Sequence, residues 1–196
     1  MTERRYEAPT LTAALDAAAG ELGCGHEELA YQVLEETGDR VVVEATVDPQ
    51  AVLGLFLRRV FTAGGMEIAT ELTSENDALH GELAGADTGL LTRCGGEALD
   101  ALQYLSNRVL DARLGEHPAV RLDSAGFKAA RRERLARLAR READRAVATR
   151  RPVRLEPMTP AARREVHVAL ADDDRVETDS DGTGFFKRVV IRPRRW

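Results

Sequence analysis

The chain has 196 residues, of which 43% are hydrophobic and 5% aromatic, with 28 Lys and Arg against 33 Asp and Glu. No apolar run approaches the ~18 residues of a membrane-spanning helix, and two cysteines, Cys24 and Cys94, are too few for a disulfide framework or a structural zinc site. Residues 1–120 carry 8 basic against 21 acidic residues, whereas residues 121–196 carry 20 against 12. We therefore expect a cytoplasmic protein without metal, cofactor or membrane insertion, whose basic C-terminal third binds a polyanion.

Residues 1–48 predict a small N-terminal domain made of a strand, a helix and a β-hairpin. Leucine and alanine residues repeat at helical spacing over Leu11–Leu22, with Thr10 as a suitable cap and Gly23 as a suitable stop. Two β-prone runs follow on either side of the turn Thr37–Asp39. These elements predict the order β-α-β-β.

Residues 49–123 predict a second domain with the order α-β-β-α-α-β. Pro49 suits the first turn of a helix, and Gly64 and Gly65 suit its end. The adjacent glycines Gly95 and Gly96 separate a short helical turn from a long amphipathic helix. The other elements are strands expected at 66–72, 78–83 and 119–122, the first two joined by a polar turn, and the long helix at 97–114.

Residues 124–196 predict a C-terminal domain in which a long helix precedes a β-α-β-β unit. The helix is expected to be capped by Ser124 and to end near Arg150, before Pro152. The whole chain is thus predicted to be α+β, with three small domains in series. The later elements are expected at 153–155, 160–170, 175–179 and 185–191, with a hairpin turn at Asp181–Gly184.

Arg163 and His167 form the first candidate site, because residues four apart on a helix share one face. A guanidinium and an imidazole placed in this way can grip a phosphate or a base edge together. The simpler alternative is a surface arginine beside a histidine that packs or caps. A catalytic role for His167 is the weaker interpretation, because the sequence suggests no local carboxylate pairing or nucleophile. The basic surroundings favour phosphate binding.

A second candidate is the arginine stripe of the long helix, formed by Arg134, Arg137 and Arg141 at spacings of three and four. A solvated helix face is the plainer interpretation, and Glu133 four residues before Arg137 supports it. The segment 128–154 nevertheless carries an excess of eight basic residues. We therefore expect some of these arginines to contact phosphates.

A third candidate is the loop Arg93, Cys94, Gly95 and Gly96, which opens onto the long helix at 97–114. Glycines before a helix N-terminus let backbone N–H groups approach a phosphate. A tight interhelical turn that needs a positive φ explains the same residues equally well. The sequence leaves both interpretations open.

Six stretches of the chain match a known family pattern. They are Asp87–Leu91, Gly96–Leu105, Phe127–Leu135, Leu155–Met158, Arg163–His167 and Val176–Gly182. The first two resemble the type II KH signature, the third the linker helix, and the last three the R-three-H domain of the bacterial Jag or KhpB (SpoIIIJ-associated) proteins. The resemblance covers nearly the whole chain and adds a Jag domain at its N-terminus.

The resemblance implies a non-enzymatic protein that binds single-stranded RNA, with single-stranded DNA as an alternative ligand, and that regulates cell elongation and envelope synthesis or acts as an RNA chaperone. It implies that Arg163 and His167 take the signature R-three-H roles, and we expect Arg164 and Lys187 to support them. A second small KH protein, similar to KhpA, or a second copy of the chain is the implied partner.

The chain departs from the family pattern in its KH loop. The family loop has the form G-x-x-G with basic residues between the glycines, whereas here Arg93 occupies the first glycine position and only Gly96 remains in place. A side chain at that position hinders close approach of the backbone to a ligand. The alternative function is therefore a protein-interaction adaptor, whose KH domain dimerises or docks and binds little RNA.

Overall fold

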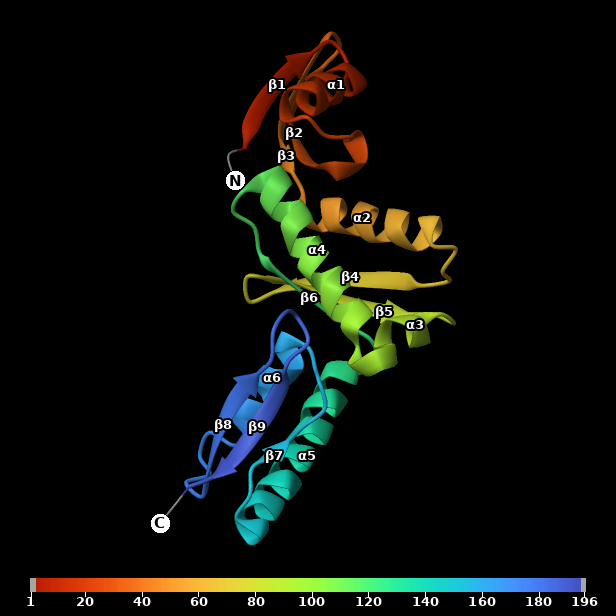
Figure 1. Cartoon of the computed structure of the whole chain (residues 1–196). Coiled ribbons are helices and arrows are strands. Elements are labelled where there is room, and N and C mark those ends of the chain that lie inside the picture. Colours follow the sequence, from red (N-terminus) through yellow and green to blue (C-terminus); the bar gives the residue numbers. More distant parts are fainter. Residues whose placement is uncertain (1–2, 195–196) are drawn as a thin grey trace. The chain divides into compact units, whose positions relative to one another are not determined.

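The computed structural model describes residues 3–194. Within this range, six α-helices and three three-stranded sheets follow one another along the chain (Figure 1), which confirms the α+β class. Two compact units result: residues up to Arg93 with Ala101–Ala125 form the first unit, and Cys94–Asp100 with the residues from Gly126 onward form the second unit. No helix of the described range has the length and apolar character needed to cross a bilayer. Nor does any group of three or more His, Cys, Asp or Glu side chains in that range lie close enough to hold a metal ion.

The first sheet has the strand order β1-β3-β2 and is antiparallel throughout. Helix α1 packs on it through Ala14 and Ala18, and its first turn is capped by the Thr10 hydroxyl, which accepts a hydrogen bond from the backbone N–H of Ala13. Gly23 ends the helix in the left-handed conformation. The elements are β1 Arg4–Ala8, α1 Leu11–Leu22, β2 Leu29–Thr37 and β3 Arg40–Val47.

The second sheet has the order β4-β5-β6, with β4 and β5 antiparallel and β5 and β6 parallel. Its elements follow the predicted order α-β-β-α-α-β. They are α2 Pro49–Ala63, β4 Ala69–Glu75, β5 Ala78–Ala84, α3 Thr88–Thr92, α4 Glu97–Leu114 and β6 Ala119–Asp123.

The hairpin between β4 and β5 corrects one boundary. The first strand was expected at 66–72, but it begins at Ala69 and continues to Glu75. The turn contains only Asn76 and Asp77, with φ values of 49° and 56°. Asn and Asp tolerate this left-handed conformation, and two such residues give the tight turn whose twist matches that of the strands. The shorter turn leaves Ser74 and Glu75 in the paired strand.

The third sheet has the antiparallel order β7-β9-β8. Helices α5 and α6 both pack on the face that carries Val176, Val189 and Ile191, and with them enclose the core of the second unit (Figure 1). Small side chains of α5, such as Ala139 and Ala143, allow this helix to approach the sheet closely. The elements are α5 Phe127–Thr149, β7 Val153–Arg154, α6 Pro160–Ala169, β8 Val176–Asp181 and β9 Arg188–Pro193.

The start of α5 was predicted incorrectly. Ser124 does not cap the helix, because Ala125 and Gly126 both adopt left-handed backbone conformations, with φ values of 50° and 68°. The helix begins at Phe127 and its cap position, Gly126, makes no side-chain cap hydrogen bond. A left-handed pair interrupts helical geometry, so a serine before it cannot reach the N–H groups of the first turn.

The last strand also begins later than predicted. Phe185 and Phe186 were expected within it, but β9 starts at Arg188 and the residues 182–187 form a loop after β8. Lys187 pairs with Met158 in an isolated antiparallel bridge and not with β8. This bridge ties the end of the loop to the segment before α6, which leaves the two phenylalanines outside the sheet.

Candidate nucleic-acid interface

Helix α6 positions the Arg163 and His167 pair. Its N-terminus is fixed by Thr159, whose hydroxyl accepts a hydrogen bond from the Ala162 N–H at 3.3 Å, and by Pro160 in the first turn. Ala162 and Val166 face inward and are buried. Arg163 and His167 each follow one of these buried residues, so they lie together on one flank of the helix, as the i, i+4 spacing predicts.

Both ring nitrogens of His167 are occupied by hydroxyl groups of β8. Nδ1 lies 2.7 Å from the Oγ1 of Thr178, and Nε2 lies 3.1 Å from the Oγ of Ser180. Partial burial is the main cause that lowers the pKa of His167, and the nearby charge of Arg163 lowers it further, while Asp179 opposes the shift. The imidazole is therefore neutral at neutral pH and joins α6 to β8.

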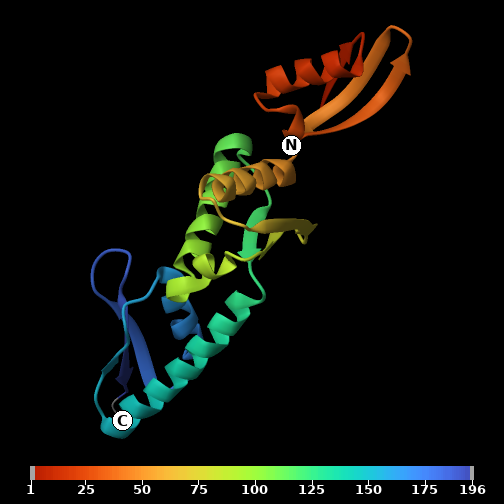
Figure 2. The ribbon, with the colours of Figure 1, turned by 90° about the vertical axis from the view of Figure 1, so that its right-hand side faces the viewer.

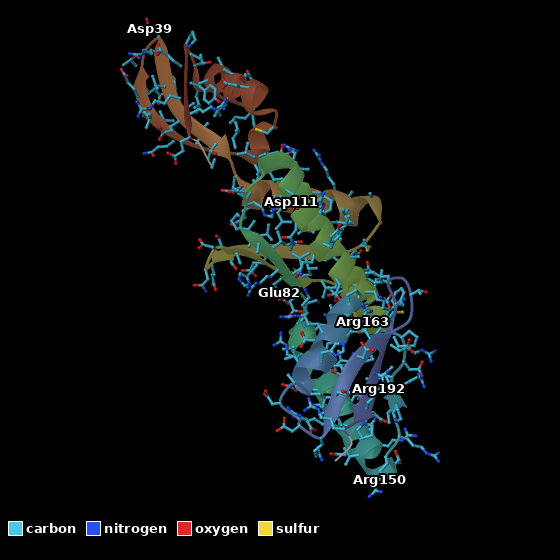
Figure 3. All side chains as sticks on the ribbon, turned by 60° about the vertical axis from the view of Figure 1, so that its left-hand side comes forward. Asp39, Glu82, Asp111, Arg150, Arg163 and Arg192 are labelled. Atoms are coloured by element: carbon cyan, nitrogen blue, oxygen red, sulfur yellow. The ribbon has the colours of Figure 1, made fainter. Side chains whose placement is uncertain are left out.

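Arg163 anchors the loop that follows β8. Its Nη1 donates hydrogen bonds to the carbonyl oxygen of Met158 at 2.9 Å and to that of Phe185 at 3.0 Å. Figure 3 labels this residue on α6, next to the strands drawn in blue. Within residues 3–194, the Nε and Nη2 atoms of Arg163 have no hydrogen-bond acceptor. One edge of the guanidinium is thus fixed and the other is available.

Arg164 and Lys187, the residues expected to support Arg163, both lie close to it. The backbone N–H of Lys187 donates to the same Met158 carbonyl at 3.4 Å, and the Met158 N–H donates to Lys187 at 2.9 Å. The Lys187 side chain is half-buried, whereas Arg164 is exposed on the outer face of α6. The structure therefore brings Lys187 and Arg163 to one place and leaves Arg164 beside them in solvent.

The arginine stripe lies on the outer face of α5 and does not adjoin Arg163 on α6. Arg134, Arg137 and Arg141 are exposed, and at about 100° per residue they lie on the face opposite the buried alanines of α5. Arg132, on the inner edge of α5, pairs with Glu165 of α6 at 3.3 Å. Glu165 is two residues from His167 and hence on the other flank of α6. The stripe is therefore one basic surface, and Arg163 with Arg164 and Lys187, the Arg163 surface, is a separate one.

Two members of the stripe have acidic neighbours on the same helix. Arg137 lies 3.5 Å from Glu133, the i, i+4 pair expected from the sequence, and Arg141 lies 3.1 Å from Glu142. The Arg137 and Glu133 side chains are each about 70% exposed, so water screens this attraction strongly and a phosphate can compete for the arginine.

The loop Arg93–Gly96 is shaped by packing. Cys94, Gly95 and Gly96 have φ values of 50°, 76° and 84°. A Cβ on Gly96 would lie 2.3 Å from the Cε1 of Phe127 on α5. The carbonyl oxygen of Gly95 accepts a hydrogen bond from the Nη1 of Arg131 at 2.8 Å. The glycine at position 96 is therefore required where the first turn of α5 presses against the start of α4.

Arg131 was not recognised as important from the sequence. It is only 6% exposed, its two terminal nitrogens bind the carboxylate of Asp100 at 2.9 and 3.1 Å, and its guanidinium carbon lies 5.6 Å from the Phe127 ring centroid. A signal was present, because Arg131 stands eight residues before Ala139 and so close to the buried face of α5. Thr178 and Ser180 were also missed as partners of His167. Their signal was the spacing of two residues, which places both hydroxyls on one face of a strand.

Comparisons with known proteins show what this chain is similar to. A model of the R-three-H domain family matches residues 133–193, which include Arg163, His167 and Lys187. The chain is 32% identical to the RNA-binding protein KhpB of Clostridium symbiosum over 202 residues, covering 96% of this chain and 90% of that protein. It is 25% identical to the RNA-binding protein KhpB of Bacillus subtilis over 198 residues, covering 93% of this chain and 94% of that protein. The resemblance found in the sequence is thereby confirmed.

Proposed function

Because this chain belongs to the KhpB (Jag) family, we propose that it binds single-stranded RNA through the basic second unit and catalyses no reaction. The observation that carries the proposal is the geometry of Arg163. Its Nη1 is held by the carbonyl groups of Met158 and Phe185, which fixes the plane of the guanidinium. The Nε and Nη2 edge is the fork that binds a phosphate in a bidentate manner.

His167 acts in this proposal as a positioning residue. Its ring is neutral and already bonded to Thr178 and Ser180, so it adds no positive charge for a phosphate. It holds α6 against β8 and thereby keeps Arg163 in place. A hydrolytic use of His167 would require turnover that disappears in His167→Ala, and the two flanking hydroxyls provide no carboxylate to orient the ring as a general base.

The arginine stripe supplies a second set of contacts with the RNA backbone. Arg134, Arg137 and Arg141 are exposed and close enough along α5 to follow a flexible strand, and Arg164 and Lys187 extend the Arg163 surface. Residues 1–120, with 21 acidic against 8 basic residues, repel a polyanion and favour its binding elsewhere on the chain. Neutralising about five phosphates gives a slope of about −3.5 for log affinity against log salt on a single strand.

Fluorescence anisotropy with a labelled single-stranded RNA of about 20 nucleotides tests the proposal, since this length spans the usual single-strand site sizes. We expect salt-sensitive binding that Arg163→Ala weakens and that Arg58→Ala, an exposed arginine of the first unit, leaves unchanged. A slope near zero, or equal affinity of the Arg163→Ala variant, would contradict it. A DNA strand of the same sequence shows whether the 2′-hydroxyl groups matter.

In the cell, we propose a cytoplasmic regulator or RNA chaperone that affects cell elongation and envelope homeostasis. The family membership supports this role. Deleting the gene and complementing it with wild type or Arg163→Ala tests it, because cell length should be restored by the wild type alone. Restoration by both would separate the cellular role from RNA binding.

An adaptor function is the second candidate, favoured by an apolar strip on α4. Tyr104 and Leu105 are 64% and 50% exposed, and Ala101 one turn earlier is exposed as well. Such a strip suits a second KH-type domain, from a KhpA-like protein or a second copy of the chain. Light scattering after size-exclusion chromatography should reveal a dimer that Tyr104→Glu dissociates. A chain that stays monomeric and also fails to bind a KH protein would contradict the adaptor function.

A further inference from the structure

The loop 182–187 carries two adjacent phenylalanine side chains in solvent. Phe185 is 61% exposed and Phe186 is 47% exposed, in a chain with five phenylalanines altogether. Their rings stand edge to face, with centroids 5.1 Å apart and an angle of 81° between the planes. Figure 2 shows the loop, drawn in blue, projecting from the sheet of the second unit. Single exposed apolar residues are common, but two adjacent aromatic rings at a loop tip call for a physical reason.

The loop is held in place at the phenylalanines and directly after them. The Phe185 carbonyl accepts a hydrogen bond from the Arg163 Nη1 at 3.0 Å, and Lys187 pairs with Met158. Gly182 and Gly184, with φ values of 118° and 76°, allow the chain to turn back before the rings. A base that stacks on rings held in this way binds at a smaller cost in conformational entropy than a base whose binding must first order a mobile loop.

The charges around the rings favour a nucleic acid over an apolar protein surface. Lys187 and Arg188 follow the rings directly, and Arg163 lies at their backbone. Two acidic side chains of β8 are paired with arginines, Asp179 with Arg192 at 3.6 Å and Asp181 with Arg154 at 3.7 Å. Aromatic faces beside cations are the features that bind unstacked bases and their phosphates.

We propose that Phe185 and Phe186 form a stacking platform for the bases of single-stranded RNA, next to the phosphate-binding edge of Arg163. The platform rests on the proposed RNA binding and names the part of the ligand that this loop contacts. Every base has a π face, so the platform adds affinity without strong sequence preference. Arg163 then has two tasks, because the guanidinium that faces a phosphate also holds the backbone beneath the rings.

The test uses two double variants of the full chain and two ligands. Phe185→Leu with Phe186→Leu keeps apolar bulk but removes the π faces, and Phe185→Tyr with Phe186→Tyr keeps them. The ligands are a labelled single-stranded RNA and a strand of equal length and charge without bases. We expect the Leu pair to bind RNA at least about fivefold more weakly, the lower limit for one lost base stack. The Tyr pair should keep most of the affinity, and the Leu pair should bind the abasic strand as the wild type does.

Three outcomes would overturn the platform. Equal RNA affinity of the Leu pair and the wild type would leave RNA binding in place and assign the rings to another surface, such as a protein partner. An equal loss on RNA and on the abasic strand would mean that the rings support binding of the strand backbone and do not stack on bases. If the wild-type chain binds neither strand at low salt, RNA binding itself is wrong and the platform is wrong with it. Both rings are exposed, so circular dichroism should be unchanged by either double variant.

Discussion

At the scale of single residues, the adjacent glycines at the start of α4 have different physical roles. Both have left-handed backbones, with φ values of 76° at Gly95 and 84° at Gly96. A Cβ at position 95 would meet nothing within 4 Å, whereas one at position 96 would lie 2.3 Å from the Phe127 ring. Gly95 is therefore needed for backbone conformation alone, and Gly96 for conformation and space.

This difference predicts the cost of two matched substitutions. Gly95→Ala should lower the free energy of unfolding by about 1–2 kcal/mol, the cost of a left-handed alanine. Gly96→Ala should lose a further ~1–3 kcal/mol, because Phe127 must move. Urea denaturation followed by circular dichroism measures both. Equal losses would mean that Phe127 does not pack against Gly96.

His167 predicts a dependence of stability on pH. Its pKa in the folded chain is lowered from the usual 6.5 by burial and by Arg163. The unfolded chain therefore takes up a proton first as the pH falls, so the contribution of His167 to stability is complete above about pH 6.5 and is lost as the pH falls through the folded-state pKa. The destabilisation caused by His167→Gln should be larger at about pH 8 than at about pH 5. A destabilisation that grows as the pH falls would contradict a neutral, hydroxyl-bonded ring.

At the scale of elements, Arg131 joins the N-terminal part of α5 to the start of α4. Its guanidinium is buried and satisfied by Asp100, the Gly95 carbonyl and the Phe127 ring. Arg131→Met should cost about 3–5 kcal/mol, because it leaves the Asp100 carboxylate without its partner. Adding Asp100→Leu to this variant should recover part of the loss. A double variant as unstable as the sum of the single variants would show that the two residues act independently.

The arginine stripe of α5 predicts an effect on RNA binding without an effect on folding. Replacing Arg134, Arg137 and Arg141 by Gln should make the salt slope shallower by about 2, at 0.7 per phosphate contact. The matched control replaces Arg58 and Arg59 of α2, which are also exposed. If the control variant changes the slope as much as the stripe variant, the stripe has no special role.

Elements with strong local signals could be predicted from the sequence, and contacts between elements could not. Thr10 caps α1 as expected, and Pro160 begins α6 as expected, because caps and first turns depend on neighbouring residues. Ser124 does not cap α5, because the left-handed residues Ala125 and Gly126 follow it. No local sequence pattern predicted the conformation of these two residues.

The candidate site shows the same limit. Helical spacing alone places Arg163 and His167 on one flank of α6. The hydroxyls that hold His167 come from β8, and the carbonyl of Phe185 that holds Arg163 comes from the loop after it. These partners are 11 to 22 residues away in sequence, so only the folded chain brings them together.

At the scale of the whole molecule, charge separates two regions of the sequence. Residues 1–120 have a net charge of −13, from 8 basic and 21 acidic residues, and residues 121–196 have a net charge of +8, from 20 and 12. A polyanion is repelled by the first region and attracted by the second, and salt weakens both effects. We therefore propose that the RNA binds to the residues from Gly126 onward, and this location is the central claim.

Photo-crosslinking measures this location directly. A single-stranded RNA containing 4-thiouridine is bound to the full chain at low salt, irradiated and digested, and the crosslinked peptides are identified by mass spectrometry. We expect crosslinks in α5 and in the loop 182–187, with few or none in residues 3–92. Crosslinks concentrated in residues 3–92, and none from Gly126 onward, would contradict the account.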